Sequence, residues 1–164
     1  MSEGAAGRPI LERLVGQLAG AVVSCHHRLG DDTAVVEAGR LVEVMRFLRD
    51  DPPLAFDMLM DLTAVDYLGR EPRFEMVYHL YSLEKNHRLR VKAGVPEQPC
   101  EIDSVLEVWP AANWLEREVW DMYGIRFRGH PDLRRLLLYE EFQGHPLRKD
   151  YPKERRQPLV GPNN

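Results

Sequence analysis

Apolar residues recur at helical spacing in two segments of the N-terminal third of the chain. Residues 9–18 place their aliphatic side chains on one stripe of a helix, and residues 39–50 do the same. The Asp-Pro-Pro sequence at 51–53 is expected to end the second helix, because proline lacks a backbone donor. Between these helices, the pattern predicts two short strands at 21–28 and 33–37, around a Gly-Asp-Asp turn.

The middle of the chain alternates apolar and polar positions with a period of two, which is typical of half-buried strands. This alternation covers residues 56–62, 74–80 and 88–95. In the first of these strands, the pattern places Met58 and Met60 on the same face as the other apolar residues. The three segments therefore predict a sheet that is covered on one face and solvated on the other.

The short Glu-Lys-Asn connection at 84–86 predicts a hairpin between the last two strands. Helices beside such a sheet indicate an α+β fold, in which a mainly antiparallel sheet has helices packed on one face and is followed by an extended C-terminal arm. We expect the α+β body to span residues 1–125 and the arm, a partner-binding segment, to span residues 126–164.

A last helix is predicted before the arm. Ser104 is expected to cap a short helix over 104–109. Asn113 and Glu116 have the spacing of a capping box, which predicts a second helix over 114–123. Gly124 is a natural left-handed stop for that helix. Beyond it, glycine and proline interrupt the chain so often that no regular element is expected.

Composition narrows the classes of function. The 164 residues carry a formal net charge of −4, and 44% of them are hydrophobic, which predicts one folded domain and argues against nucleic-acid binding. Cys25 and Cys100 are too few for a four-cysteine zinc or iron–sulfur site, so we expect reduced thiols. The sequence shows neither an apolar leader nor a run of about 18 apolar residues, so we expect no membrane span.

The most informative stretch runs from Asn113 to Pro152 and reads NWLEREVWDMYGIRFRGHPDLRRLLLYEEFQGHPLRKDYP. It resembles the C subunit family (30-kDa subunit family) of respiratory complex I, the NADH:quinone oxidoreductase, whose motif is a helix with E-R-E-x-x-D-x-x-G-I, a G-H-P-D-L-R-R loop and then G-H-P-L-R-K-D-Y-P. The residues that match, and that we expect to form the family motif and partner interface, are Glu116, Arg117, Glu118, Asp121, Gly124, Gly129, His130, Pro131, Asp132, Leu133, Arg134, Arg135, Gly144, His145, Pro146, Leu147, Arg148, Lys149, Asp150, Tyr151 and Pro152.

The resemblance implies a non-catalytic structural subunit of the hydrophilic arm of complex I, supporting electron transfer from NADH to quinone coupled to proton translocation. It implies no cofactor in this chain, with FMN, iron–sulfur clusters and quinone held by partner subunits. The D subunit and other hydrophilic-arm subunits are the implied partners. The implied location is peripheral, on the cytoplasmic face of the bacterial inner membrane, or on the matrix side if the protein is mitochondrial. An equivalent subunit of a related membrane-bound hydrogenase or other-donor quinone reductase is an alternative.

The charged residues of the last helix favour structural roles. Arg117 and Asp121 lie four positions apart and are expected to pair on the helix surface. Glu116 and Glu118 are only two positions apart, so they point in different directions and do not form an acid–base pair in one cleft. We therefore expect capping and ion pairing from these side chains, and no catalytic residue in the chain.

The tripeptide Gly-His-Pro occurs twice inside the motif, at 129–131 and 144–146. We expect their histidines to fix loops through hydrogen bonds. The alternative is a stand-alone metal-dependent hydrolase with His130, His145 and Asp150 as ligands, which lacks a further ligand at a recognised spacing.

Three basic pairs lie in the arm, at 134–135, 148–149 and 155–156. Arginine suits paired contacts with carboxylates across a protein interface, and anionic lipid or RNA is the alternative partner. We expect the arm to leave backbone and charge unsatisfied until it docks on a partner. The residues expected to act in pairs within and between chains are Glu116, Arg117, Asp121, Arg134, Arg135, Arg148 and Asp150.

Overall fold

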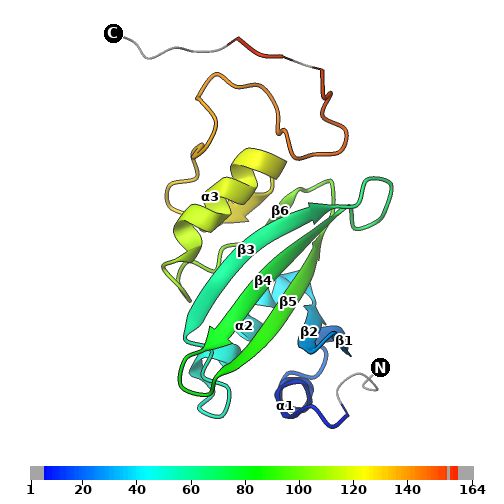
Figure 1. Cartoon of the computed structure of the whole chain (residues 1–164), viewed down its shortest axis with the longest axis vertical. Coiled ribbons are helices and arrows are strands. Elements are labelled where there is room, and N and C mark those ends of the chain that lie inside the picture. The colour runs from blue at the N-terminus through cyan, green and yellow to red at the C-terminus, as the bar shows by residue number, and fades with distance from the viewer. Residues whose placement is uncertain (1–5, 155, 159–164) are drawn as a thin grey trace.

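The computed structural model describes residues 6–154 and 156–158 of the chain. The elements follow the order expected for an α+β protein (Figure 1). They are α1 (Pro9–Gln17), β1 (Val22–Arg28), β2 (Asp31–Val36), the short 3₁₀ helix η2 (Ala38–Arg40), α2 (Leu41–Asp50), β3 (Met58–Asp66), β4 (Phe74–Ser82), β5 (His87–Val95), β6 (Glu101–Asp103), α3 (Ala112–Tyr123) and β7 (Arg126–Arg128).

The main sheet has five strands in the order β1-β2-β5-β4-β3. Three of its four pairings are antiparallel, and the β4–β5 hairpin closes with Ser82 opposite His87, as predicted. The pairing of β2 with β5 is parallel, so the sheet is mixed and mostly antiparallel. The β1–β2 turn lies earlier in the sequence than predicted, because β2 already begins at Asp31, which was expected to be part of the turn.

One continuous hydrophobic core lies on the helix-covered face of the sheet. Leu14 of α1, Val44 of α2 and Val119 of α3 belong to the same buried cluster as Tyr78 and Val91 of the sheet. In Figure 1, α2 lies behind the sheet, and α3 packs beside β3. The predicted fold class is thereby confirmed, and the arm from Gly129 follows as a segment without regular secondary structure.

The strict alternation predicted for β3 is wrong at its first residues. The register between β3 and β4 shifts between Leu59 and Asp61, so the strand contains an irregularity at Met60. An extra residue in one strand changes the face to which the preceding side chains point. As a result Leu59 is buried, whereas Met58 and Met60 are 42% and 46% exposed.

Two predicted helix starts are also wrong. Residues 105–108 form a turn instead of a helix, and the Ser104 hydroxyl accepts the N–H of Leu106 in this turn. Helix α3 begins at Ala112 with Ala111 as N-cap, and no side chain caps it, so Asn113 and Glu116 do not form a capping box. The helix does end at Gly124, which has φ 75° in the left-handed region, as predicted.

The predicted division of the chain at residue 125 stays a prediction. The strand that follows this point, β7, pairs in parallel with β6, and its central residue Phe127 is 2% exposed and joins the core cluster. The first three residues of the predicted arm therefore pack with the body.

The close approach of Gly94 in β5 to Pro72 yields a first prediction. A Cβ at Gly94 would overlap the Pro72 ring, which is rigid and cannot move aside as a flexible side chain would. Gly94→Ala is expected to lower the free energy of unfolding by about 1–3 kcal/mol, measured by denaturant titration. Gly16→Ala in α1 is the control, since its Cβ would meet no atom, and it is expected to stabilise by up to about 1 kcal/mol. A neutral Gly94→Ala would contradict this description of the packing.

Candidate functional site: the arm on helix α3

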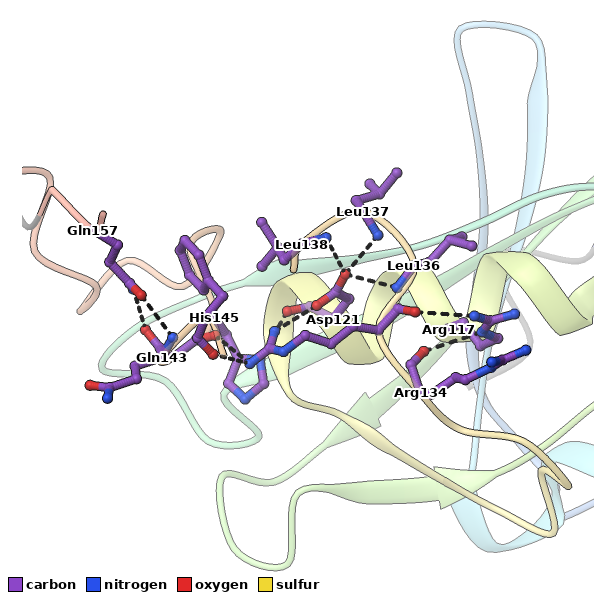
Figure 2. A network of polar contacts seen from close by, with 12 residues as sticks. Arg117, Asp121, Arg134, Leu136, Leu137, Leu138, Gln143, His145 and Gln157 are labelled. Atoms are coloured by element: carbon purple, nitrogen blue, oxygen red, sulfur yellow. Dashed lines mark hydrogen bonds and ion pairs between the residues drawn. The ribbon is translucent and has the colours of Figure 1, made fainter. Parts of the chain in front are cut away.

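The arm first runs along α3 in the same direction as the helix. His130 contacts the backbone oxygen of Asn113 through Nε2 at 3.2 Å. One helical turn further on, Arg117 donates from Nε to the Arg134 carbonyl (3.2 Å) and from Nη2 to the Arg135 carbonyl (3.1 Å) (Figure 2). These contacts place the arm directly over the outer face of the helix.

The carboxylate of Asp121 is the centre of the site. Its side chain is completely buried, and its Oδ2 accepts hydrogen bonds from three successive backbone N–H groups, those of Leu136, Leu137 and Leu138, at 3.1, 2.9 and 3.0 Å. The other oxygen accepts a bond of 2.6 Å from Nη1 of Arg135. Figure 2 shows this loop of the arm closing over the carboxylate. We call this arrangement the Asp121 cradle.

The cradle determines the charge state of Asp121. Burial acts to raise its pKa, but the three backbone N–H groups and the Arg135 guanidinium together outweigh burial and hold the pKa below its ordinary value. A lowered folded-state pKa means that the carboxylate stabilises the folded chain at neutral pH. That contribution is lost as the pH falls through the folded-state pKa.

Arg135 connects the cradle to the next part of the arm. Its Nη2 donates to the carbonyl of Phe142 at 2.7 Å and contacts that of Gly144 at 3.4 Å. The guanidinium also lies 5.9 Å from the centre of the Trp120 ring and 5.8 Å from that of Phe142. Arg135 thus has both an ionic partner and aromatic neighbours, which is the environment that suits arginine and not lysine.

The end of the described arm closes back on this loop. Gln157 accepts a hydrogen bond from the backbone N–H of Gln143 at 2.9 Å, and its amide nitrogen donates to the Gln143 carbonyl at 2.7 Å (Figure 2). The same nitrogen lies 2.9 Å from the hydroxyl of Tyr151. Residues 14 positions apart are therefore joined side by side.

A second anchor lies at the C-terminal end of α3. Arg148 donates from Nε to the Tyr123 carbonyl at 2.6 Å, and its Nη2 lies 3.5 Å from Sγ of Cys100. The backbone N–H of Leu147 donates to the Met122 carbonyl at 3.2 Å. These bonds satisfy carbonyl groups that the last turn of a helix otherwise leaves without partners.

A third anchor joins the arm to the sheet through Arg73, which is 2% exposed. Arg73 donates from Nε and Nη2 to the two oxygens of buried Asp66 at 3.0 and 2.9 Å. Its Nη1 donates to Glu97 at 2.6 Å and to Asp150 at 3.0 Å. The backbone N–H of Lys149 donates to Asp66 as well, at 2.8 Å. Bonding to Arg73 lowers the pKa of both Asp66 and Asp150.

Sequence reasoning missed Arg73, Asp66 and Glu97. The sequence does place residues of opposite charge at the two ends of the β3–β4 connection, since Asp66 ends β3 and Arg73 precedes β4, and this could have indicated the ion pair between them. The arm residue that Arg73 binds, Asp150, lies 77 positions after it, which no local pattern reveals.

The two histidines of the repeated tripeptides fix the arm, as predicted, but with different ring nitrogens. His130 accepts the N–H of Asp132 at Nδ1 (3.1 Å), so its Nε2 carries the proton and donates to Asn113. His145 donates from Nδ1 to the Asp121 carbonyl at 2.9 Å. Burial lowers the pKa of His145, which keeps that ring neutral.

Glu116 and Glu118 have opposite environments, as their spacing predicted. Glu118 is exposed, whereas Glu116 is fully buried and accepts bonds from the Ser104 hydroxyl (2.6 Å) and the Val105 N–H (2.7 Å). Burial raises the pKa of Glu116 to about 7, although these two hydrogen bonds act in the other direction. The carboxyl group thus fastens the turn before α3 to the helix.

Two interpretations of the charged residues need correction. Arg117 and Asp121 do not pair with each other, because Arg117 binds arm carbonyls and Asp121 binds the arm's N–H groups. Nor does the arm leave all of its charges unsatisfied, because Arg135, Arg148 and Asp150 bind groups in the body of their own chain. The ion pair of Arg134 is with Asp132 at the surface, where the two side chains are 72% and 54% exposed, so this pair is not buried.

The other motif residues differ in exposure. The half-buried ones, which the structure brings together against α3 and the sheet, are Arg117, Gly124, His130, Leu133, Arg135, His145, Pro146, Arg148 and Tyr151. The exposed ones are Glu118, Gly129, Pro131, Asp132, Arg134, Gly144, Leu147, Lys149, Asp150 and Pro152. Arg155 lies outside the described residues, so its part in the third basic pair is not described.

The three residues considered as ligands of a hydrolase metal each bind a different group of the chain. His130 contacts Asn113, His145 contacts Asp121, and Asp150 binds Arg73. Within the described ranges, no group of three or more His, Cys, Asp or Glu side chains is placed to hold a metal ion. The structure therefore does not bring His130, His145 and Asp150 together.

The class of protein is the respiratory-chain NADH dehydrogenase 30 Kd subunit. The model of that family matches residues 34–157, which include most of the sheet and the anchored arm. The chain belongs to this family. It is 54% identical to the C subunit of the NADH-quinone oxidoreductase of Geobacter metallireducens over 135 residues, covering 80% of this chain and 82% of that protein. The C subunit from Methylobacterium radiotolerans is 53% identical over 148 residues, covering 90% of this chain and 68% of that protein.

The fold is shared with solved structures, including the two that follow. A trypsin-resistant fragment of Nqo5, residues 1–134 of that protein, superposes with a TM-score of 0.65 and 34% identity, covering 76% of this chain and 96% of the fragment. A chain of a membrane-bound sulfane sulfur reductase, an archaeal respiratory membrane complex, superposes with a TM-score of 0.76 over 88% of this chain and 85% of its own. At 24% identity, this second likeness shows the fold alone.

Removing the charge of Asp121 tests the cradle. Asp121→Asn keeps the shape of the side chain but leaves Arg135 without its ionic partner, so we expect a loss of about 3 kcal/mol in stability. The amides of residues 136–138 should exchange with deuterium faster than in the parent protein. Asp132→Asn, at an exposed ion pair, is the matched control and should change stability by less than about 1 kcal/mol. Unchanged exchange at 136–138 in Asp121→Asn would show that the carboxylate does not hold the arm.

Gly124 offers a second test, because it needs both a left-handed backbone and an empty Cβ position. A Cβ at Gly124 would lie 2.5 Å from Nε2 of His145. Gly129 has a similar φ of 82° with open space around it. Gly129→Ala should therefore cost about 1–2 kcal/mol from backbone conformation alone, whereas Gly124→Ala should cost at least about 1 kcal/mol more from overpacking. Equal losses in thermal or chemical unfolding would contradict the His145 contact.

Proposed function

We propose that this chain is the C subunit of an NADH–quinone oxidoreductase and that it acts through structure, with no catalytic residue and no cofactor of its own. The names of its relatives support the assembly, since the C subunit of NADH-quinone oxidoreductase recurs among proteins about half identical to it. FMN, iron–sulfur clusters and quinone are then held by partner subunits. Electron transfer from NADH to quinone, coupled to proton translocation, is the reaction that the chain serves.

The observation that carries this proposal is the internal satisfaction of the arm. The buried ionisable side chains of Asp121, Arg73 and Glu116 all bind other groups of the same chain, which leaves none of these three side chains free to work on a substrate. The outer surface formed by the arm and α3 carries large apolar side chains that are exposed to solvent. The exposed fractions are 68% for Trp114, 61% for Leu137 and 51% for Leu147. A surface of this kind suits contact with another polypeptide.

The D subunit and other subunits of the hydrophilic arm are the partners that we propose for this surface. The arm would reach them already folded, so little conformational entropy is lost on docking. Within the described ranges, no helix has the length and apolar character that crossing a membrane requires. We propose peripheral attachment through the complex, on the cytoplasmic face of a bacterial inner membrane.

An equivalent place in a complex with another electron donor is the alternative. The same fold occurs in a chain of a sulfane sulfur reductase, a respiratory complex whose name gives a different electron acceptor and no donor. The two possibilities differ in the donor and share the docking role, so purification of the intact complex and identification of its flavoprotein would separate them.

The docking role is tested at Leu137. Its backbone N–H is held by Asp121, while its side chain is exposed, so Leu137→Glu should leave the fold and unfolding midpoint unchanged. A charge buried in an interface is costly, and we expect at least a tenfold weaker association with the rest of the complex, equivalent to about 1.4 kcal/mol or more. Recovery of the assembled, quinone-reducing complex from membranes measures this.

Leu83→Glu is the matched control for this experiment. Leu83 is 65% exposed beside the β4–β5 turn, which lies at the opposite end of the sheet from the arm (Figure 1). Normal assembly of Leu137→Glu would argue against this surface as the docking site. Reduction of quinone by NADH with the purified chain alone would overturn the structural role itself.

A further inference from the structure

Helix α3 holds two buried carboxyl groups with unequal partners. Asp121 has the Arg135 guanidinium and three N–H groups, as described above. Glu116 is equally inaccessible, at 0% exposure, but it forms no ion pair within the part of the chain that the structure describes. Its two hydrogen bonds come from neutral donors, Ser104 and Val105. A buried carboxyl group without a cation is stable as the neutral acid.

The groups around Glu116 reinforce this asymmetry. Tyr78 of β4 is completely buried, and its hydroxyl makes no hydrogen bond within the described residues. Asp103 of β6 is an acid on the adjoining strand, and Arg128 of β7 already binds it at 2.8 Å. Glu107, in the turn itself, is exposed and pairs with Arg46 of α2. The two cations among these groups, Arg128 and Arg46, are each paired with another carboxylate, and neither forms an ion pair with Glu116.

Ser104 connects the buried carboxyl group with the surface. It lines a small surface hollow together with Asp103, Glu107, Arg128 and Gly129. Its hydroxyl donates to Oε2 of Glu116 at 2.6 Å and accepts the N–H of Leu106 at 3.1 Å. Ser104 therefore lies between a solvent-facing hollow, which it helps to line, and an otherwise inaccessible carboxyl group, to which its hydroxyl donates.

We propose that Glu116 is a buried proton-binding site that exchanges its proton with solvent through the Ser104 hydroxyl, and that this proton controls how firmly the turn at residues 104–109 is held to α3. A proton from the hollow binds Oγ of Ser104, and the original hydroxyl proton of Ser104 passes to Oε2 of Glu116. The new O–H of Glu116 then donates to Ser104, while Oε1 still accepts the Val105 N–H. The reverse transfer returns the proton to water.

The charge state of Glu116 gives the direction of the pH dependence. Burial raises the pKa of this carboxyl group in the folded chain to about 7, above the ordinary value of 4.5. The folded state therefore binds one more proton than the unfolded state between these two values. Stability is highest below the unfolded-state pKa and falls as the pH rises through the folded-state pKa. This is opposite in sign to the effect of Asp121.

The test uses the full chain and compares Glu116→Gln with Glu118→Gln, an exposed glutamate on the same helix. The contribution of Glu116 should lower the folding equilibrium constant by up to about a hundredfold between about pH 5 and pH 8, against an opposite contribution from His145, whose pKa is lowered by burial. Glu118→Gln should keep this dependence, whereas Glu116→Gln should lose most of it. The infrared carbonyl band of a buried protonated carboxyl group should vanish over the same range and be absent from Glu116→Gln.

Ser104→Ala keeps the glutamate and tests whether the Ser104 hydroxyl is coupled to its protonation. Since the hydroxyl hydrogen bond lowers the pKa of Glu116, its loss should move the midpoint of the infrared titration to higher pH. An unmoved midpoint would remove Ser104 from the proposal. A parent protein without a titrating buried carboxyl band would overturn the proposal as a whole, even if Glu116→Gln failed to fold. None of these outcomes depends on the assembly in which the chain works.

Discussion

The carboxylate of Asp121 accepts hydrogen bonds from three successive backbone N–H groups and from one guanidinium, and water has no access to it. A loop with so little regular structure would otherwise expose its N–H groups to solvent and sample many conformations. Asp121 gives the loop an internal acceptor of fixed position, much as a helix gives its own N–H groups fixed carbonyls. The contacts of Phe142 and Gly144 follow from that position, because Arg135 extends from the same carboxylate to their carbonyl groups.

Two largely buried ion pairs hold the arm to the body of the chain. At one end the Arg135 side chain is 15% exposed against a fully buried aspartate, and at the other the Arg73 side chain is 3% exposed among three carboxylates. Breaking either contact would leave a charge in a poorly hydrated place, which is much more costly than breaking a surface pair. The arm is therefore best understood as a folded part of the subunit, whose outer surface is available to a partner.

Much of the fold was predictable because it depends on short-range periodicity. The β4–β5 hairpin, helix α2 and the Gly124 stop follow from alternation, helical spacing and one residue's tolerance of positive φ. The irregularity at Met60 was not predictable, since an extra residue in a strand leaves the local pattern of side chains plausible in both registers. Nor was the parallel pairing of β2 with β5, which depends on where a whole hairpin docks.

The candidate site was predictable as a set of residues and less so as a set of contacts. The motif correctly drew attention to Asp121 and Arg148, but their partners are mostly backbone groups, which sequence letters do not mark. Arg73 escaped notice because its contact with Asp150 exists only once the chain has folded.

The parallel contact between β2 and β5 also has a consequence for how the chain is made. Thr33 lies opposite Arg90, so 57 residues separate two neighbours in the same sheet. During synthesis from the N-terminus, the β1–β2 hairpin must wait, with one edge unpaired, until β5 has left the ribosome and formed its own hairpin with β4. Nascent chains at this stage present an open strand edge to their neighbours, and such an edge can pair with another chain until β5 covers it.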